Sequence, residues 1–175
     1  MKLFGPLTRS VALAGLLAST LMAATPALAA KADVDLLKSY IGSWKGRGEL
    51  IGAEKEAVVC RLTLSEGNQD KVNYSGRCTL AGTTLSVNGS LAFSDANRRY
   101  EAAMTSNVSF SGLAVGKRQG NTVVFDLKER NKDEAGNDLT VSARIVLSAE
   151  KINVGFSVVF NATGDSLRAD VPFNK

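Results

Sequence analysis

Strict alternation of apolar and polar residues is the feature that most constrains the fold of this chain. Segment 139–147 has apolar side chains at every second position, and segment 152–160 repeats the pattern. Side chains of a β-strand point alternately to the two faces of a sheet, so a period of two predicts strands with one apolar and one polar face. Such strands are typical of antiparallel sheets in which one face covers a core and the other meets water.

The same alternation recurs along most of the chain after residue 42. Further examples are segments 58–64, 72–80 and 85–93, and clusters of Gly, Asn and Asp separate the segments. About ten strands result, which predicts a single antiparallel β domain over residues 30–175. A closed up-and-down barrel of about 8–10 strands would leave no exposed sheet edge. A two-sheet sandwich would show the same alternation, so this pattern alone leaves both architectures open.

A short helical segment is expected before the first strand. Apolar residues at Val34, Leu37 and Ile41 follow the spacing of one helix face, and Gly42 provides the stop. The strand that follows begins Gly42-Ser43-Trp44, and this opening resembles that of the calycin superfamily, which includes lipocalins and the nitrobindin-like bacterial barrels. The resemblance implies a lipocalin-like barrel whose Trp44 closes one end.

The first 29 residues have the pattern of a cleavable bacterial signal peptide. Lys2 and Arg9 precede an apolar stretch over residues 11–24, and Ala27-Leu28-Ala29 has the small-residue pattern of a cleavage site. The apolar stretch is shorter than the roughly 20 residues that span a bilayer, which disfavours a retained membrane anchor. We therefore expect a protein that does not span the membrane, exported to the periplasm or the medium.

Export gives the two cysteines an oxidising environment, in which a disulfide is the simplest expectation. A hairpin centred on residue 69, within the turn-forming segment 66–70, places Cys60 directly opposite Cys78 on the apolar face. A reactive thiol pair would favour the Cys-x-x-Cys spacing, which these two cysteines lack. The predicted bridge and the predicted hairpin therefore support each other.

An interior cavity is a possible ligand site in such a barrel. Five glycines, at positions 46, 48, 76, 89 and 112, fall on the inward phase, where they either allow the sheet to curve or leave room for a ligand. Ligand pockets are mostly apolar with few polar groups. The candidate cavity residues are Trp44, Leu62, Tyr74, Tyr100, Met104, Phe110, Phe125, Phe156 and Phe160, with the two tyrosines as polar groups. A filled core would have the same character.

Three basic residues form a row on the outward phase. The registers of the first two hairpins place Lys45, Arg61 and Arg77 side by side on adjacent strands. Like charges directly opposite each other repel, so the row either extends into water or binds an anionic surface. In the first case, Glu49 or Glu56 is expected to lie near enough to offset the charge.

The composition excludes several functions. The chain has no histidine and two cysteines, which excludes Ser-His-Asp and Cys-His catalytic sets, a histidine-ligated haem of the nitrobindin type, and a four-cysteine zinc site. Two of the 21 basic residues and none of the 17 acidic residues lie in the first 29 positions, so the remainder carries a net charge of +2. This small charge and the predicted export disfavour nucleic-acid binding. Asp126 and Glu129 are expected on the outer surface, and we predict no enzyme activity, cofactor or metal site.

Two functional hypotheses remain. The first is an exported lipocalin-like protein that binds a small apolar or amphipathic ligand. The second is a barrel without a ligand that acts through its surface on a cell-envelope component or a protein partner, or inhibits a secreted enzyme. An open interior favours the first hypothesis, and a packed interior favours the second.

Overall fold

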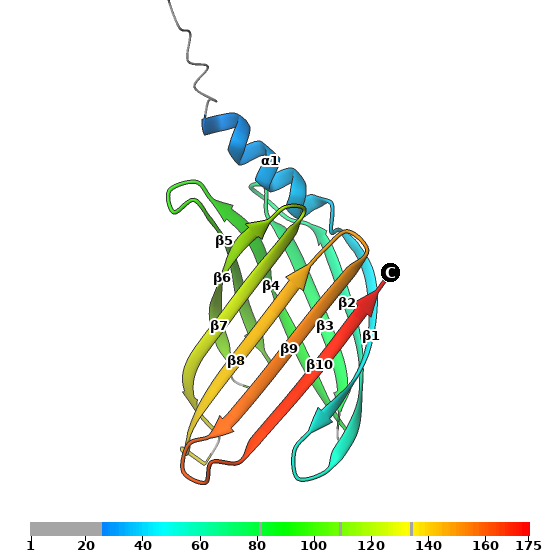
Figure 1. Ribbon diagram of the computed structural model, residues 1–175, viewed down its shortest axis with the longest axis vertical. Helices are drawn as coiled ribbons and strands as arrows, with labels where there is room; N and C mark the ends of the chain where they lie inside the picture. Colours follow the sequence, from blue (N-terminus) through cyan, green and yellow to red (C-terminus); the bar gives the residue numbers. More distant parts are fainter. Residues whose placement is uncertain (1–25, 81, 109, 134) are drawn as a thin grey trace, which may run out of the picture.

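The chain forms a closed barrel of ten antiparallel strands with one helix across one end (Figure 1). The computed structural model describes residues 26–80, 82–108, 110–133 and 135–175. The helix is α1 (Pro26–Lys38). The strands are β1 (Gly42–Ile51), β2 (Lys55–Glu66), β3 (Val72–Leu80), β4 (Thr83–Ser94), β5 (Arg99–Ser106), β6 (Ser111–Gln119), β7 (Thr122–Lys132), β8 (Asp138–Leu147), β9 (Lys151–Phe160) and β10 (Ser166–Asn174).

The strand order confirms the predicted up-and-down barrel. Every strand pairs with the next strand along the chain, and β1 pairs with β10 to close the ring. Closure satisfies the backbone groups that the two terminal strands of an open sheet would expose. The sequence had left a sandwich open, and the pairing of β1 with β10 decides for the barrel.

The registers of the first two hairpins are as predicted. Trp44 lies opposite Leu62 in the β1–β2 pair, and Cys60 lies opposite Cys78 in the β2–β3 pair. A disulfide joins the two cysteines, which confirms the predicted bridge.

Helix α1 begins earlier than the predicted helical segment. It starts at Pro26. Proline has no backbone N–H, but an N–H in the first turn of a helix has no intrahelical acceptor, so no hydrogen bond is lost there. It ends at Lys38, and a turn over residues 39–41 leads into β1. Most of the predicted signal peptide, residues 1–25, lies outside the described residues, and the predicted cleavage site at Ala29 lies within α1.

The core is densest at the end of the barrel that α1 covers. The largest side chains with less than 2% exposure come from α1, the turn after it and the strand ends nearby: Leu37, Tyr40, Trp44, Tyr100, Phe125 and Ile152. Leu37 faces the barrel from the last turn of α1 and is fully buried. The expected burial of Trp44 at this end, beneath the helical segment, is therefore confirmed.

Three of the inward glycines make room for neighbouring atoms of the barrel. A Cβ atom on Gly46 would lie 2.8 Å from the ring of Phe173, and one on Gly76 would lie 2.8 Å from Val87. At Gly89 the obstacles are the side chain of Tyr74 and the backbone carbonyl of Ala103. At these three positions a neighbouring side chain or backbone carbonyl already occupies the space beside the glycine, which favours the packing role of these glycines.

Candidate functional site

The end of the barrel beneath α1 is sealed by hydrogen-bonded aromatic residues. The indole Nε1 of Trp44 donates a hydrogen bond to the carbonyl oxygen of Tyr40, 3.1 Å away. The hydroxyl of Tyr40 donates in turn to the carbonyl oxygen of Asn121, in the β6–β7 turn. Burial raises the pKa of Tyr40 to about 12. The turn after α1 is thereby fastened to a loop on another part of the rim.

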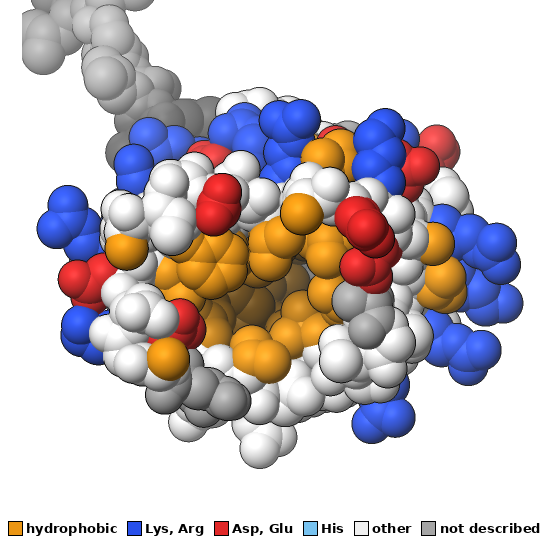
Figure 2. Space-filling view, turned by 90° about the horizontal axis from the view of Figure 1, so that it is seen from below, with side chains coloured by type: hydrophobic (Ala, Val, Ile, Leu, Met, Phe, Trp, Pro, Cys, Tyr) orange, Lys and Arg blue, Asp and Glu red, His pale blue; other side chains and the backbone are white. Residues whose placement is uncertain are grey.

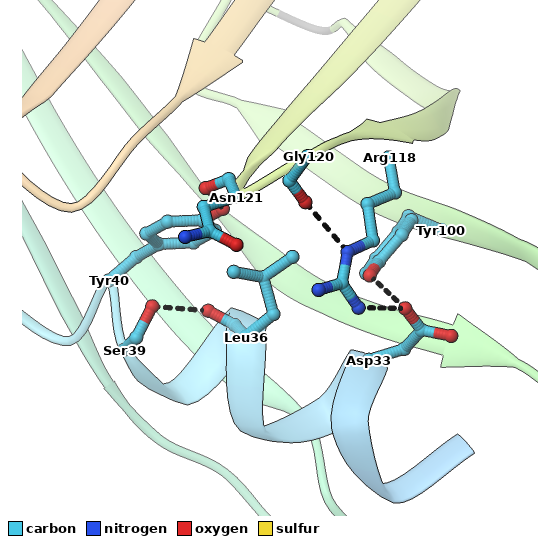
Figure 3. Close-up of polar contacts among 8 residues, drawn as sticks. All are labelled: Asp33, Leu36, Ser39, Tyr40, Tyr100, Arg118, Gly120 and Asn121. Carbon is cyan, nitrogen blue, oxygen red and sulfur yellow. Dashed lines mark hydrogen bonds and ion pairs between the residues drawn. The ribbon is translucent and has the colours of Figure 1, made fainter. Parts of the chain in front are cut away.

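A second set of contacts fastens α1 itself (Figure 3). Oδ1 of Asp33 accepts a 2.6 Å hydrogen bond from the hydroxyl of Tyr100 and a 3.0 Å bond from Nη1 of Arg118. Nε of Arg118 also donates to the carbonyl oxygen of Gly120. The Asp33 side chain is 14% exposed, so the pairing takes place largely out of water. These contacts hold the helix as a plug over the closed end.

The opposite end of the barrel is open. Figure 2 looks into this end and shows a hollow lined by hydrophobic side chains. Inward residues become more exposed toward it: on β9, Ile152 is fully buried, whereas Val154, Phe156, Val158 and Phe160 are partly exposed. The same change occurs on β5, from buried Tyr100 to partly exposed Met104. The apolar interior is therefore accessible to solvent from the end opposite α1.

The wall of this open half is loosened between β6 and β7. Their recorded pairing runs from Val115–Asp126 to Gln119–Thr122, next to the α1 end. Nearer the mouth, the side chains of Phe110 and Leu127 both lie over Gly112, within 3.0 and 3.3 Å of where its Cβ atom would be. Apolar side chains thus cover the inner face of the sheet where the pairing between β6 and β7 ends.

The predicted cavity residues divide between the two halves. Trp44, Tyr100 and Phe125 are no more than 2% exposed and belong to the closed end. Leu62 and Tyr74 are partly buried at intermediate depth. Met104, Phe110, Phe156 and Phe160 are partly exposed on the inward phase of the open half. The structure adds Leu85, Leu139 and Val158, which are also inward and partly exposed.

Neither tyrosine is a free polar group of the cavity. The hydroxyl of Tyr74 donates to the carbonyl oxygen of Ala103, across the intervening Gly89, and the hydroxyl of Tyr100 is bound to Asp33. Burial is the main cause that raises the pKa of both side chains, so they stay neutral. The polar character of the open half comes from other residues.

Charged residues occupy inward positions at the two ends of the described strands. At the closed end, Glu66 and Arg118 pair with Lys38 and Asp33 of α1. At the open end, Glu56 lies opposite Leu50 and Glu129 lies opposite Val141, and both of these partners are buried. Alternation along uninterrupted strand pairs therefore places both carboxylates on the inner face.

These two glutamates correct the sequence interpretation. Glu129 was expected on the outer surface, but it is in phase with the buried Leu127. Glu56 was expected near the outward basic row, but it is in phase with the buried Val58. The register of the first hairpin already implied the position of Glu56, since it places this residue opposite Leu50. For Glu129 the available signal was its spacing from Phe125 and Leu127.

The basic row lies on the outer wall. Arg61 is opposite Lys45 on one side and opposite Arg77 on the other, and all three side chains are exposed. The recorded ion pairs give none of the three a carboxylate partner among the described residues. Repulsion between directly opposed like charges is therefore not relieved by a neighbouring acid.

Two further hollows lie on the outer wall. One of about 980 Å³ crosses β1 and β7–β10, and one of about 590 Å³ crosses β3–β6. In the larger hollow, Arg144 is paired with Asp126 at 2.8 Å, and Asp170 accepts a hydrogen bond from Asn153. Three of the charged side chains that line this hollow are therefore engaged in polar contacts.

No helix in the described part of the chain is both long and apolar enough to cross a bilayer. Within the same residues, no group of three or more Cys, Asp or Glu side chains has an arrangement that would hold a metal ion.

Comparison with solved structures bears on the fold. No protein-family model and no curated protein matches the sequence. The structure is similar to that of Rv2717c from M. tuberculosis, with a TM-score of 0.64 and 11% identity over 81% of this chain and 96% of that one. It is also similar to the S-type phycobiliprotein lyase CPES from Guillardia theta, with a TM-score of 0.51 and 9% identity over 83% and 96% of the two chains.

At these identities the similarity concerns the fold. The shared fold agrees with the barrel that the resemblance of the Gly42-Ser43-Trp44 opening implies. By its strand order, its closure and these neighbours, the described chain is a lipocalin-like β-barrel.

Proposed function

We propose that this protein is an exported, periplasmic lipocalin-like protein that binds a small apolar or amphipathic ligand in the open half of its barrel. The observation that carries the proposal is the apolar hollow opposite α1 (Figure 2). An apolar surface that faces water is costly, and a concave one is the usual form of a ligand site. The signal-like pattern of residues 1–29 and the Cys60–Cys78 disulfide support export.

The sealed end gives the proposed site one entrance. Trp44 and Tyr40 close the barrel beneath α1, so a ligand would enter from the opposite end and lie along the inner faces of β4, β5 and β9. The proposed role is binding without catalysis.

A titration with N-phenyl-1-naphthylamine, a neutral apolar dye that fluoresces out of water, tests the proposal. Val158→Trp would fill the hollow from an inward, partly exposed position, whereas Val159→Trp changes the adjacent side chain, which is 36% exposed on the outer wall. We expect Val158→Trp to weaken dye binding by about tenfold or more, as the loss of several apolar contacts would do. Val159→Trp should bind like the parent protein.

Failure of the parent protein to bind the dye, or equal binding by both variants, would contradict a ligand site inside the barrel. Native mass spectrometry of protein isolated from the periplasm is an independent measurement, in which a retained apolar or amphipathic molecule would support the proposal and identify the ligand. Thermal unfolding of both variants controls for a loss of folding.

The second candidate is a role at the surface, and the Lys45–Arg61–Arg77 row favours it. Three cations that form no ion pair within the described part of the chain offer a site for an anionic envelope component. Ligand binding is preferred because the hollow of the open half leaves apolar side chains facing water, which surface binding would not cover.

A further inference from the structure

We propose that the ligand of the open half is an amphipathic cation, with an apolar chain inside the barrel and an ammonium group at the mouth between Glu56 and Glu129. This inference rests on the proposed function, and it adds the charge and the orientation of the ligand. It follows from the distribution of charge on the inner face of the barrel.

The two glutamates lie on opposite walls. Around the closed ring, four strands separate β2 from β7 in either direction. Glu56 is the second residue of β2, directly after the β1–β2 turn, and Glu129 lies three residues before the end of β7. Both positions are at the end of the barrel opposite α1, so the carboxylates face the mouth from two sides.

The inner face supplies no cation of its own to balance them. At the inward positions of the described strands, the one basic residue is Arg118, which is bound to Asp33 at the closed end. Neither Glu56 nor Glu129 has a recorded ion pair or side-chain hydrogen bond among the described residues, whereas Glu66, the inward glutamate of the closed end, pairs with Lys38. The inward charge of the open half is therefore negative and unneutralised.

The turns at the mouth reinforce this charge. Glu54 lies in the β1–β2 turn, Asp133 in the β7–β8 turn and Asp165 in the β9–β10 turn. Figure 2 shows acidic side chains at the rim of the hollow and Lys and Arg side chains around the outer perimeter. Strand alternation explains the separation, because Lys55 and Lys132 fall on the outward phase.

The physical consequence is selectivity by charge. An anionic headgroup at the mouth would meet two carboxylates in a partly enclosed space, where water screens charge less than on an open surface. A cationic headgroup would be attracted by the carboxylates while its chain removed apolar wall from water. Neutral chains should bind with intermediate affinity.

Competition against bound N-phenyl-1-naphthylamine tests the inference. The competitors are dodecyltrimethylammonium, dodecanol and dodecyl sulfate, which share one chain length and differ in headgroup charge, each used below its micelle concentration. We expect the cation to displace the dye at a concentration roughly tenfold lower than the sulfate, since each exposed ion pair is worth up to about fivefold. The preference should shrink as salt rises to about 0.15 M.

The double variant Glu56→Gln/Glu129→Gln should lose the preference for the cation while its affinity for the neutral dye stays within about twofold. The matched control is Glu49→Gln/Glu150→Gln. It removes the same charge, but Glu49 is on the outer wall and Glu150 is in a turn at the closed end. The control should keep the preference, which would exclude an effect of net charge.

The outcomes separate this inference from the proposed function. If the dye binds and all three competitors displace it equally, or if the control loses the preference as the double variant does, the charge selectivity is wrong while the apolar site stands. If neither the dye nor any amphiphile binds the parent protein, the proposed function fails and this inference fails with it. The comparison of headgroups on the parent protein needs no variant to fold.

Discussion

The hydroxyl of Tyr100 donates a 2.6 Å hydrogen bond to Oδ1 of Asp33, which lies 67 positions earlier in the chain. This contact joins α1 to the inner face of β5, and Arg118 adds a second donor to the same oxygen. The plug over the closed end is thus held by a polar contact as well as by the buried Leu37. Leaving a buried donor without its acceptor lowers the free energy of unfolding by more than the loss of an exposed hydrogen bond does.

Asp33→Asn should lower the free energy of unfolding by about 1–2 kcal/mol, because two hydrogen bonds lose their charged acceptor. Asp35→Asn is the matched control on the same helix, since its partner Lys31 is 71% exposed and such pairs contribute little. Urea unfolding measures both changes. Equal effects of the two substitutions would contradict a structural role for Asp33.

Trp44→Ala should destabilise the barrel by about 3–5 kcal/mol, as truncation of a large buried aromatic side chain does. The indole is 1% exposed, and Nζ of Lys175 lies 4.8 Å from its ring centre. Trp44 is the single tryptophan of the chain, so the fluorescence of the protein reports on it alone. We expect blue-shifted emission that iodide does not quench. Emission typical of solvated indole would contradict the sealed end.

The disulfide should contribute about 3 kcal/mol or less, since it closes a short loop within one hairpin. The cysteines are 18 positions apart and directly opposed. Reductant should lower the melting temperature of the parent protein and leave that of Cys60→Ala/Cys78→Ala unchanged. Two alkylatable thiols in unreduced native protein would contradict the bridge.

Stability should fall at alkaline pH because two of the three tyrosines are buried and the third, Tyr74, is partly buried. Burial raises the pKa of Tyr40 from 10.0 to about 12, and it also raises those of Tyr74 and Tyr100. The unfolded chain releases these protons first, so the contribution is complete below pH 10 and is lost as the pH rises through about 12. Melting temperatures across this range measure the effect. Tyrosinate absorbance near pH 10 in folded protein would contradict it.

The basic row should bind anionic vesicles weakly and in a salt-dependent manner. We expect Arg61→Glu/Arg77→Glu to abolish binding at low salt without loss of stability, because both side chains are exposed and repel each other. Lys117→Glu/Lys128→Glu changes the net charge equally at other exposed positions and should retain binding. Sedimentation with vesicles measures both variants. No binding by the parent protein at low salt would leave the row without this role.

The sequence alone determined the strands, most of the turns and the disulfide, because these depend on local pattern and on registers that short hairpins impose. Period-two alternation predicted about ten strands and located several of them, and the turn after residue 66 determined that Cys60 faces Cys78. The row formed by Lys45, Arg61 and Arg77 followed from the same local rule.

Tertiary structure decided what depends on closure. Pairing of β1 with β10 excluded the sandwich, and the covering of one end by α1 divided a uniform apolar pattern into a sealed half and an open half. The contact of Asp33 with Tyr100 joins residues distant in sequence, which no local pattern encodes. Alternation assigns Glu56 and Glu129 to the inner face of the sheet. Only closure of the sheet into a barrel places them on opposite walls of the open end.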